Sequence, residues 1–109
     1  MTLKQASIFV FGAEQICSSC LHSPSSKDTF EWLEAALMRK FPASSFQIEY
    51  IDIFHPPIDK DKQQLAKRII DEEMIYPVVV MEGKVIAEGN PHLPSIYRKM
   101  EAVGIKPNS

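Results

Sequence analysis

The sequence lacks a basic excess and a long apolar run. Its net charge of −2 differs from the basic charge of general nucleic-acid binders and of proteins that bind anionic membranes. No apolar run approaches the ~20 residues that a membrane-spanning helix requires. The first twelve residues contain only a short apolar stretch and no small-residue cleavage site of the kind that ends a signal peptide. We therefore expect a cytoplasmic protein with no nucleic-acid or membrane partner.

Several common kinds of active-site motif are also missing. The sequence contains no glycine-rich phosphate loop, no pair of catalytic carboxylates and no Ser-His-Asp order. Cysteine is scarce, because only Cys17 and Cys20 occur, both in the stretch ICSSCLH. The chain of 109 residues, 45% of them hydrophobic, is long enough for one core, and we expect one domain over residues 1–109.

The apolar pattern predicts seven elements. Spacings of three and four predict helices over 28–41, 59–73 and from about 92–95 to 103. Shorter runs predict strands over 6–11, 46–53, 78–81 and 84–88, with a two-residue turn at 82–83. The buried stripe of the first helix would be Phe30, Leu33, Leu37 and Phe41, and that of the second Leu65, Ala66, Ile69 and Ile70. Asp28, with Glu31 three residues later, suits an N-terminal cap.

The element order is β-α-β-α-β-β-α, which defines an α/β fold with a four-stranded mixed sheet. The first two strands are joined through a helix and should be parallel. The last two are joined by a tight turn and must be antiparallel.

The cysteine pair is compatible with three interpretations. As a dithiol, the two side chains could form and release a disulfide without much backbone movement. As part of a metal site, Cys17 and Cys20 could be joined by His22, with His55, His92 or a carboxylate as a fourth ligand. They could also be ordinary loop residues. Because the chain has no second C-x-x-C or H-x-x-x-H pair, we favour redox chemistry and expect no metal and no other cofactor.

Two long segments, CSSCLHSPSSKDTFEWLEAALMRKFP and YPVVVMEGKVIAEG, resemble the YuzD-like disulfide oxidoreductases of the thioredoxin superfamily. The likeness covers about residues 6–103 and implies a thioredoxin-like fold. It also implies that Cys17 attacks and Cys20 resolves, with protein thiols or disulfides as the substrate. The bond between Tyr76 and Pro77 would be cis, and both residues would face the cysteine pair and contact the substrate.

The sequence departs from thioredoxins around the motif. Thioredoxins have Trp before the first cysteine and Gly-Pro between the two, whereas this chain has Ile16 and Ser18-Ser19. The first predicted strand supplies no buried acid. Ser18, Ser19 and His22 would modulate the thiolate through hydrogen bonds and charge. These departures leave a second interpretation open, namely a non-catalytic thioredoxin-like binding module whose cysteines act as a redox sensor or metal clip. No feature specifies an oligomeric state.

Overall fold

The computed structural model describes residues 6–13, 26–89 and 91–107 of the chain. Its elements are β1 (Ala6–Gly12), α1 (Ser26–Lys40), the 3-10 turn η2 (Ala43–Ser45), β2 (Phe46–Asp52), α2 (Lys60–Asp71), β3 (Val78–Met81), β4 (Lys84–Glu88) and α3 (Leu93–Ala102). The sheet order is β2-β1-β3-β4, with β1 and β2 parallel and the other two pairs antiparallel. The predicted element order and the four-stranded mixed sheet are confirmed.

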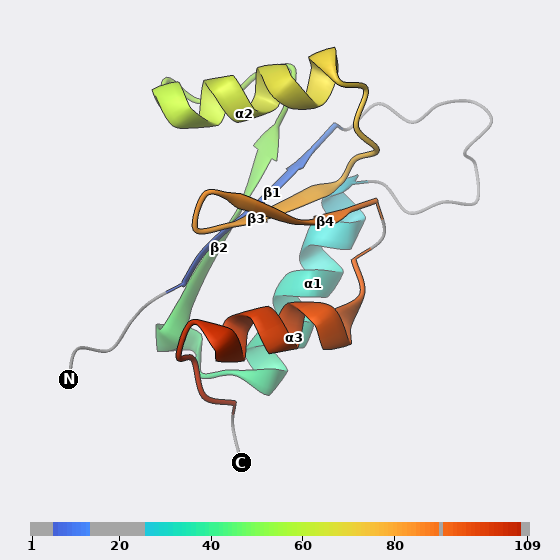
Figure 1. Ribbon diagram of the computed structural model, residues 1–109. Helices are drawn as coiled ribbons and strands as arrows, with labels where there is room; N and C mark the ends of the chain where they lie inside the picture. Colours follow the sequence, from blue (N-terminus) through green and yellow to red (C-terminus); the bar gives the residue numbers. More distant parts are fainter. Residues whose placement is uncertain (1–5, 14–25, 90, 108–109) are drawn as a thin grey trace.

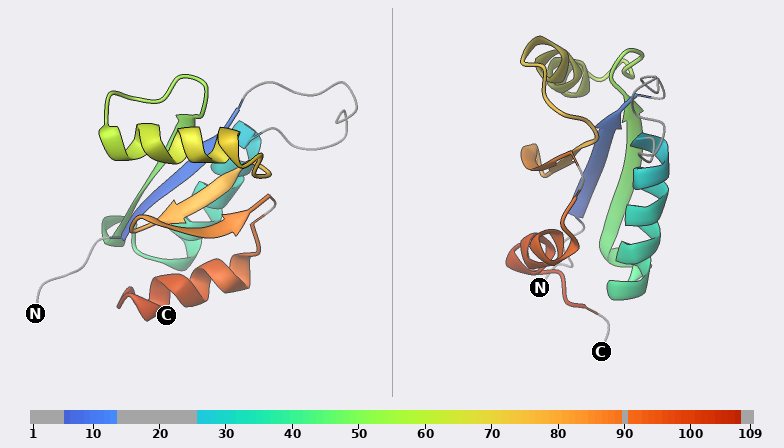
Figure 2. Two further views of the ribbon diagram at one scale, coloured as in Figure 1. Left: turned by 45° about the horizontal axis from the view of Figure 1, so that its top comes forward. Right: turned by 90° about the vertical axis from the view of Figure 1, so that its right-hand side faces the viewer.

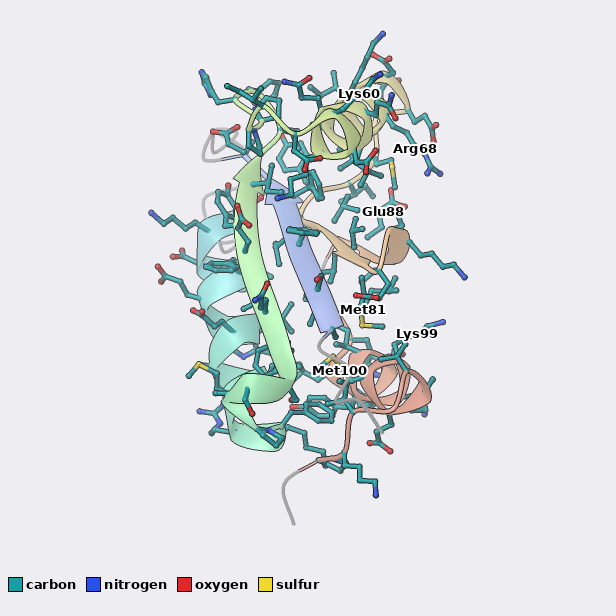
Figure 3. The ribbon with its side chains drawn as sticks, turned by 90° about the vertical axis from the view of Figure 1, so that its left-hand side faces the viewer. Lys60, Arg68, Met81, Glu88, Lys99 and Met100 are labelled. Atoms are coloured by element: carbon teal, nitrogen blue, oxygen red, sulfur yellow. The ribbon has the colours of Figure 1, made fainter. Side chains whose placement is uncertain are left out.

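The sheet separates two hydrophobic cores. The larger core lies between the sheet and helices α1 and α3, and the smaller one between the sheet and α2 (Figures 1 and 2). In the larger core, Met81 of β3 packs with Met100 of α3 (Figure 3). β3 is buried along its whole length, which explains its continuous apolar run. None of the helices in the described residues is long and apolar enough to cross a membrane.

The helices have the apolar faces that the sequence predicts, with two corrections. The predicted stripe of α1 is buried in the larger core or packed against it. This helix begins at Ser26, so Asp28 lies inside the first turn and is not the N-terminal cap. The stripe of α2 is narrower than predicted, because the Ile70 side chain is 42% exposed.

β4 contains a one-residue bulge. Val80 pairs with Val85, but the preceding residue of β3 pairs with Ala87, which leaves Ile86 as the extra residue. Ile86 and Ala87 consequently both pack against the larger core, although they are neighbours in the chain. The bulge moves the end of β4 by one residue relative to the start of β3. It therefore decides which residues of the two strands lie opposite each other at that end of the sheet.

α2 ends at Asp71, two residues earlier than predicted, and the chain leaves the helix through a residue with an unusual backbone. Glu73 has a φ of 51°, in the left-handed region where a Cβ atom is unfavourable. Its N–H donates to the carbonyl of Ile70 at 3.2 Å, and the N–H of Met74 donates to the carbonyl of Ile69 at 3.0 Å. Glycine is the residue most often found at this position of such a helix end.

Replacing Glu73 with glycine is expected to raise the free energy of unfolding by about 0.5–1 kcal/mol, because glycine adopts this conformation without a Cβ penalty. Urea unfolding followed by circular dichroism measures the change. Glu72→Gly is the matched control, since Glu72 has a φ of −91° and should lose stability when it becomes glycine. Equal changes in the two variants would contradict the explanation.

Candidate functional site

At one end of the sheet, β1, β2 and β4 finish and β3 starts. In the β1–β2 ladder, Gly12 lies opposite Asp52. The β1–β3 register, continued by one residue, sets Gly12 level with Pro77. The N–H of Gly89 donates to the carbonyl of Pro77 at 3.0 Å. We call these four residues the strand-end row, and the connections that adjoin it are residues 13–25, 53–59, 72–76 and 90–92.

The predicted redox pair belongs to the first of these connections. Cys17 and Cys20, with the predicted modulating residues Ser18, Ser19 and His22, lie outside the described residues. Cys17 stands five residues beyond Gly12 along the chain, a length that spans at most ~18 Å. The chain length therefore allows Cys17 to reach Pro77, which is the neighbour of Gly12 in the strand-end row.

The two ends of this connection meet at Gly12 and Ser26. A Cβ atom on Gly12 would overlap the Cβ of Ser26 and would lie 2.5 Å from its Oγ. Ser26 opens α1 and is buried. The strand and the helix thus approach so closely that only glycine fits at position 12, and the segment with the cysteines starts and finishes at one point beside the strand-end row.

The connection after β2 is tied to the same point. The N–H of Ile53 donates to the carbonyl of Gly12 at 2.9 Å. The Asp52 carboxylate accepts from the N–H of Phe54 at 2.9 Å, and its other oxygen lies 3.5 Å from Nδ1 of His55. The only carboxylate in the row is therefore already engaged with its own loop.

The connection before β3 carries the two predicted substrate-contacting residues. The bond between Tyr76 and Pro77 is cis. The side chain of Tyr76 is 38% exposed, and that of its neighbour Ile75 is 67% exposed. Together they form an apolar surface next to the start of β3.

Hydrogen bonds to the last residue of β4 and to the residue after it hold the backbone of this connection. The Ile75 N–H donates to Oε2 of Glu88 at 2.8 Å. The Gly89 N–H donates to the carbonyl of Ile75 at 2.9 Å as well as to that of Pro77. Gly89 has a φ of 79°, and a Cβ there would meet Ile75 Cγ2 at 3.4 Å, so this position also favours glycine.

The described residues hold no cluster of three or more His, Cys, Asp or Glu side chains that could bind a metal. Of the two described histidines, His55 lies beside Asp52, and Nδ1 of His92 lies 3.0 Å from Oγ of Ser95. Each is thus engaged with a residue of its own segment.

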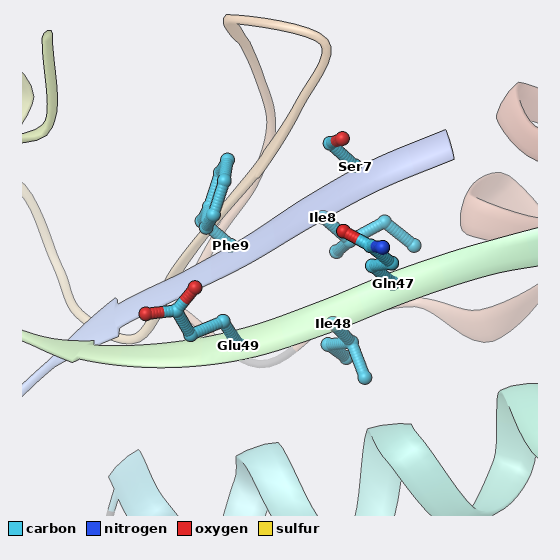
Figure 4. A pocket seen from close by; sticks show the side chains of 6 residues that line it. All are labelled: Ser7, Ile8, Phe9, Gln47, Ile48 and Glu49. Atoms are coloured by element: carbon cyan, nitrogen blue, oxygen red, sulfur yellow. The ribbon is translucent and has the colours of Figure 1, made fainter. Parts of the chain in front are cut away.

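A shallow hollow lies elsewhere on the sheet and was not predicted. It has a volume of about 220 Å³ and is lined by Ser7, Ile8, Phe9, Gln47, Ile48 and Glu49. In Figure 4 the Phe9 and Glu49 side chains rise from one face of the sheet, while Ile48 points toward α1 on the other. Lys62 of α2 lies over the Phe9 ring, with its Nζ 4.5 Å from the ring centroid and 3.8 Å from the Glu49 carboxylate. The hollow lies at least three residues along the strands from the strand-end row, about 10 Å away.

Glu88 and Gly89 are the site residues that the sequence interpretation missed. A regular hairpin around the turn at 82–83 would set Glu88 opposite Pro77. The bulge instead sets Gly89 there and leaves the Glu88 side chain free to reach Ile75. Glycine directly after a strand was the available signal, since it often marks a positive φ or a close backbone approach.

The element order, the sheet topology and the adjoining connections define a thioredoxin-like domain. The chain belongs to the family described as "Protein of unknown function (DUF1462)", whose model matches residues 9–101. It is 45% identical over 106 residues to "Putative disulfide oxidoreductase YuzD" of Bacillus subtilis (strain 168), covering 97% of this chain and 98% of the relative. It also resembles the crystal structure of the protein of unknown function SA0789 from Staphylococcus aureus. That match has a TM-score of 0.74 at 34% identity and covers 91% of each chain.

Gly12→Ala is expected to lower the free energy of unfolding by about 1–3 kcal/mol, because the new methyl group has no space beside Ser26. Thermal or urea unfolding measures the loss. Combining it with Ser26→Gly removes the atoms that clash, so the double variant should be more stable than the sum of the two single changes implies. If the changes in the free energy of unfolding were strictly additive, there would be no steric contact between residues 12 and 26.

Proposed function

We propose that the protein is a cytoplasmic thiol–disulfide oxidoreductase that uses Cys17 and Cys20 as its dithiol. One observation carries the proposal: the segment with the C-x-x-C pair leaves the sheet at Gly12, level with Pro77. The printed name of the Bacillus subtilis relative points to the same activity. The cytoplasm keeps protein thiols reduced, so a close cysteine pair there is more often catalytic than structural.

The reaction consists of two exchanges. The thiolate of Cys17 attacks one sulfur of a substrate disulfide, forms a mixed disulfide and releases the other substrate sulfur as a thiolate. The thiolate of Cys20 then attacks the Cys17 sulfur and releases the second substrate thiolate. The substrate gains two electrons and, with two protons from solvent, leaves as two thiols, while the protein becomes the disulfide.

The substrate is an extended polypeptide. Among the described residues, no hydrogen bond engages the N–H or the carbonyl of Tyr76, whereas those of Ile75 are both engaged. Within this part of the chain, Tyr76 thus has one donor and one acceptor available, which suits a short antiparallel pairing with a peptide. The exposed Ile75 and Tyr76 side chains add an apolar surface that a small thiol would not need.

Neighbouring polar groups would activate the nucleophile. Ser18 and Ser19 would donate hydrogen bonds to the thiolate, and a protonated His22 would stabilise it by its charge. α1 begins at Ser26, six residues after Cys20, and a helix dipole acts only close to its first turn. This last observation favours the second candidate, a thioredoxin-like binding module without turnover, in which the pair is a redox sensor or metal clip.

Two cysteine variants separate these candidates. Cys17→Ser is expected to reduce the rate of exchange with a peptide disulfide to the rate without protein. Cys20→Ser should keep the attacking thiol and accumulate a covalent protein–peptide adduct, which mass spectrometry detects and dithiothreitol removes. Unfolding curves serve as the control that both variants are folded. Wild-type exchange rates in Cys17→Ser would refute the proposed role of Cys17.

A further inference from the structure

We propose that Glu88 is a positioning residue that holds Tyr76 in place for a peptide substrate. This inference rests on the proposed function and extends it to a residue that does not itself meet the substrate. The carboxylate of Glu88 accepts the N–H of Ile75 at 2.8 Å, across the loop that leads into β3.

The hydrogen bonds in this loop engage the residues on either side of Tyr76 and leave its own backbone without a partner among the described residues. Of the three loop residues from Ile75 to Pro77, proline has no N–H, and its carbonyl is bonded to Gly89. The donor and the acceptor of Ile75 are bonded to Glu88 and Gly89. Within the described residues, the backbone of Tyr76 is therefore the part of this loop that remains available. The other groups are bonded to Glu88, the last residue of β4, and to Gly89, which follows it.

Glu88 is well placed to fix the loop. It is the last residue of β4 and pairs through its backbone with Val78, so its side chain starts from an ordered strand. An ionised carboxylate forms a stronger hydrogen bond to an N–H than a neutral acceptor does. Without it, the Ile75 N–H would bond to water, and of the two hydrogen bonds described for the Ile75 backbone only the one from Gly89 would remain. A peptide would then have to order Tyr76 as it binds, which weakens binding.

The chain contains a matched control at the other end of the same hairpin. Oε2 of Glu82 accepts the N–H of Ser7 at 2.8 Å, a carboxylate-to-backbone bond of the same length as that of Glu88. Glu82 lies in the turn between β3 and β4, away from the strand-end row. Its removal should cost stability in the same way without touching the Tyr76 loop.

The test is a single-turnover measurement on the reduced full-length protein. Peptide probe and protein are mixed over a range of probe concentrations, which separates the half-saturating concentration from the maximal rate. The probe is a decapeptide carrying one cysteine as a mixed disulfide with glutathione. For Glu88→Ala we expect the half-saturating concentration to rise roughly tenfold, the effect of losing one charge-assisted hydrogen bond. The maximal rate should change much less. The rate with 2-hydroxyethyl disulfide, which has no backbone to pair with Tyr76, should fall less than that with the peptide.

Two conservative variants distinguish reach from charge. Glu88→Gln keeps an acceptor oxygen at the same distance along the side chain and should restore the wild-type half-saturation in part, because a neutral acceptor bonds the N–H less strongly than a carboxylate does. Glu88→Asp keeps the charge but is one methylene too short, and should behave like Glu88→Ala. Glu82→Ala should leave half-saturation unchanged while losing stability.

Equal effects of Glu88→Ala and Glu82→Ala on half-saturation, or no effect of either, would overturn the positioning role while leaving the proposed function intact. If the wild-type protein exchanged with neither probe, and so behaved as Cys17→Ser is expected to, the proposed function would be overturned. The role of Glu88 would be overturned with it. If Glu88→Asp restored the wild-type half-saturating concentration and Glu88→Gln did not, the negative charge and not the hydrogen bond would explain the effect. That result would contradict the inference.

Discussion

The one-residue bulge between β3 and β4 is the constraint on which the candidate site depends. Because Ile86 is the extra residue, Gly89 comes level with Pro77, and its N–H can donate to two carbonyls of the loop before β3. The same shift frees the Glu88 carboxylate to accept the Ile75 N–H. The energetic support for the bulge comes from burial, since two consecutive side chains of β4 pack against the larger core. Core packing on one face of the sheet is thus coupled to the shape of a loop at its edge.

A second constraint acts on the other side of the strand-end row. Gly12 is in the central strand β1, and its missing side chain lets α1 begin directly against it, at Ser26. The carbonyl of Gly12 also accepts the N–H of Ile53. Strand β1 therefore joins the connection that contains the cysteines to the one that follows β2, while hydrogen bonds from β4 hold the connection before β3. The site is a product of the register of four strands and not of any one motif.

Sequence patterns predicted most of the fold, and they failed where tertiary contacts decide local structure. Period and length identified the three α-helices and the four strands of the described residues, but not the 3-10 turn η2, which buries no residue. The start of α1 was placed too late, since the contact of Ser26 with Gly12 lies outside any local capping rule. The bulge could not be foreseen, because a strand of five residues is too short for its alternation to reveal one extra residue. The cis bond before Pro77 was expected from the family resemblance alone, since few X-Pro bonds are cis. Cys17 and Cys20 were recognised by spacing, whereas the residues that hold Tyr76 carry no motif.

The most direct test of the account is a redox titration of the cysteine pair. The protein is equilibrated in glutathione buffers of graded potential, free thiols are trapped by alkylation, and modified cysteines are counted by mass. We predict a reversible two-electron transition of Cys17 and Cys20 with a midpoint between about −200 and −270 mV, the range from glutaredoxins to thioredoxin. Alkylation of both thiols at every potential would contradict it, because a pair that forms no disulfide cannot exchange one with a substrate.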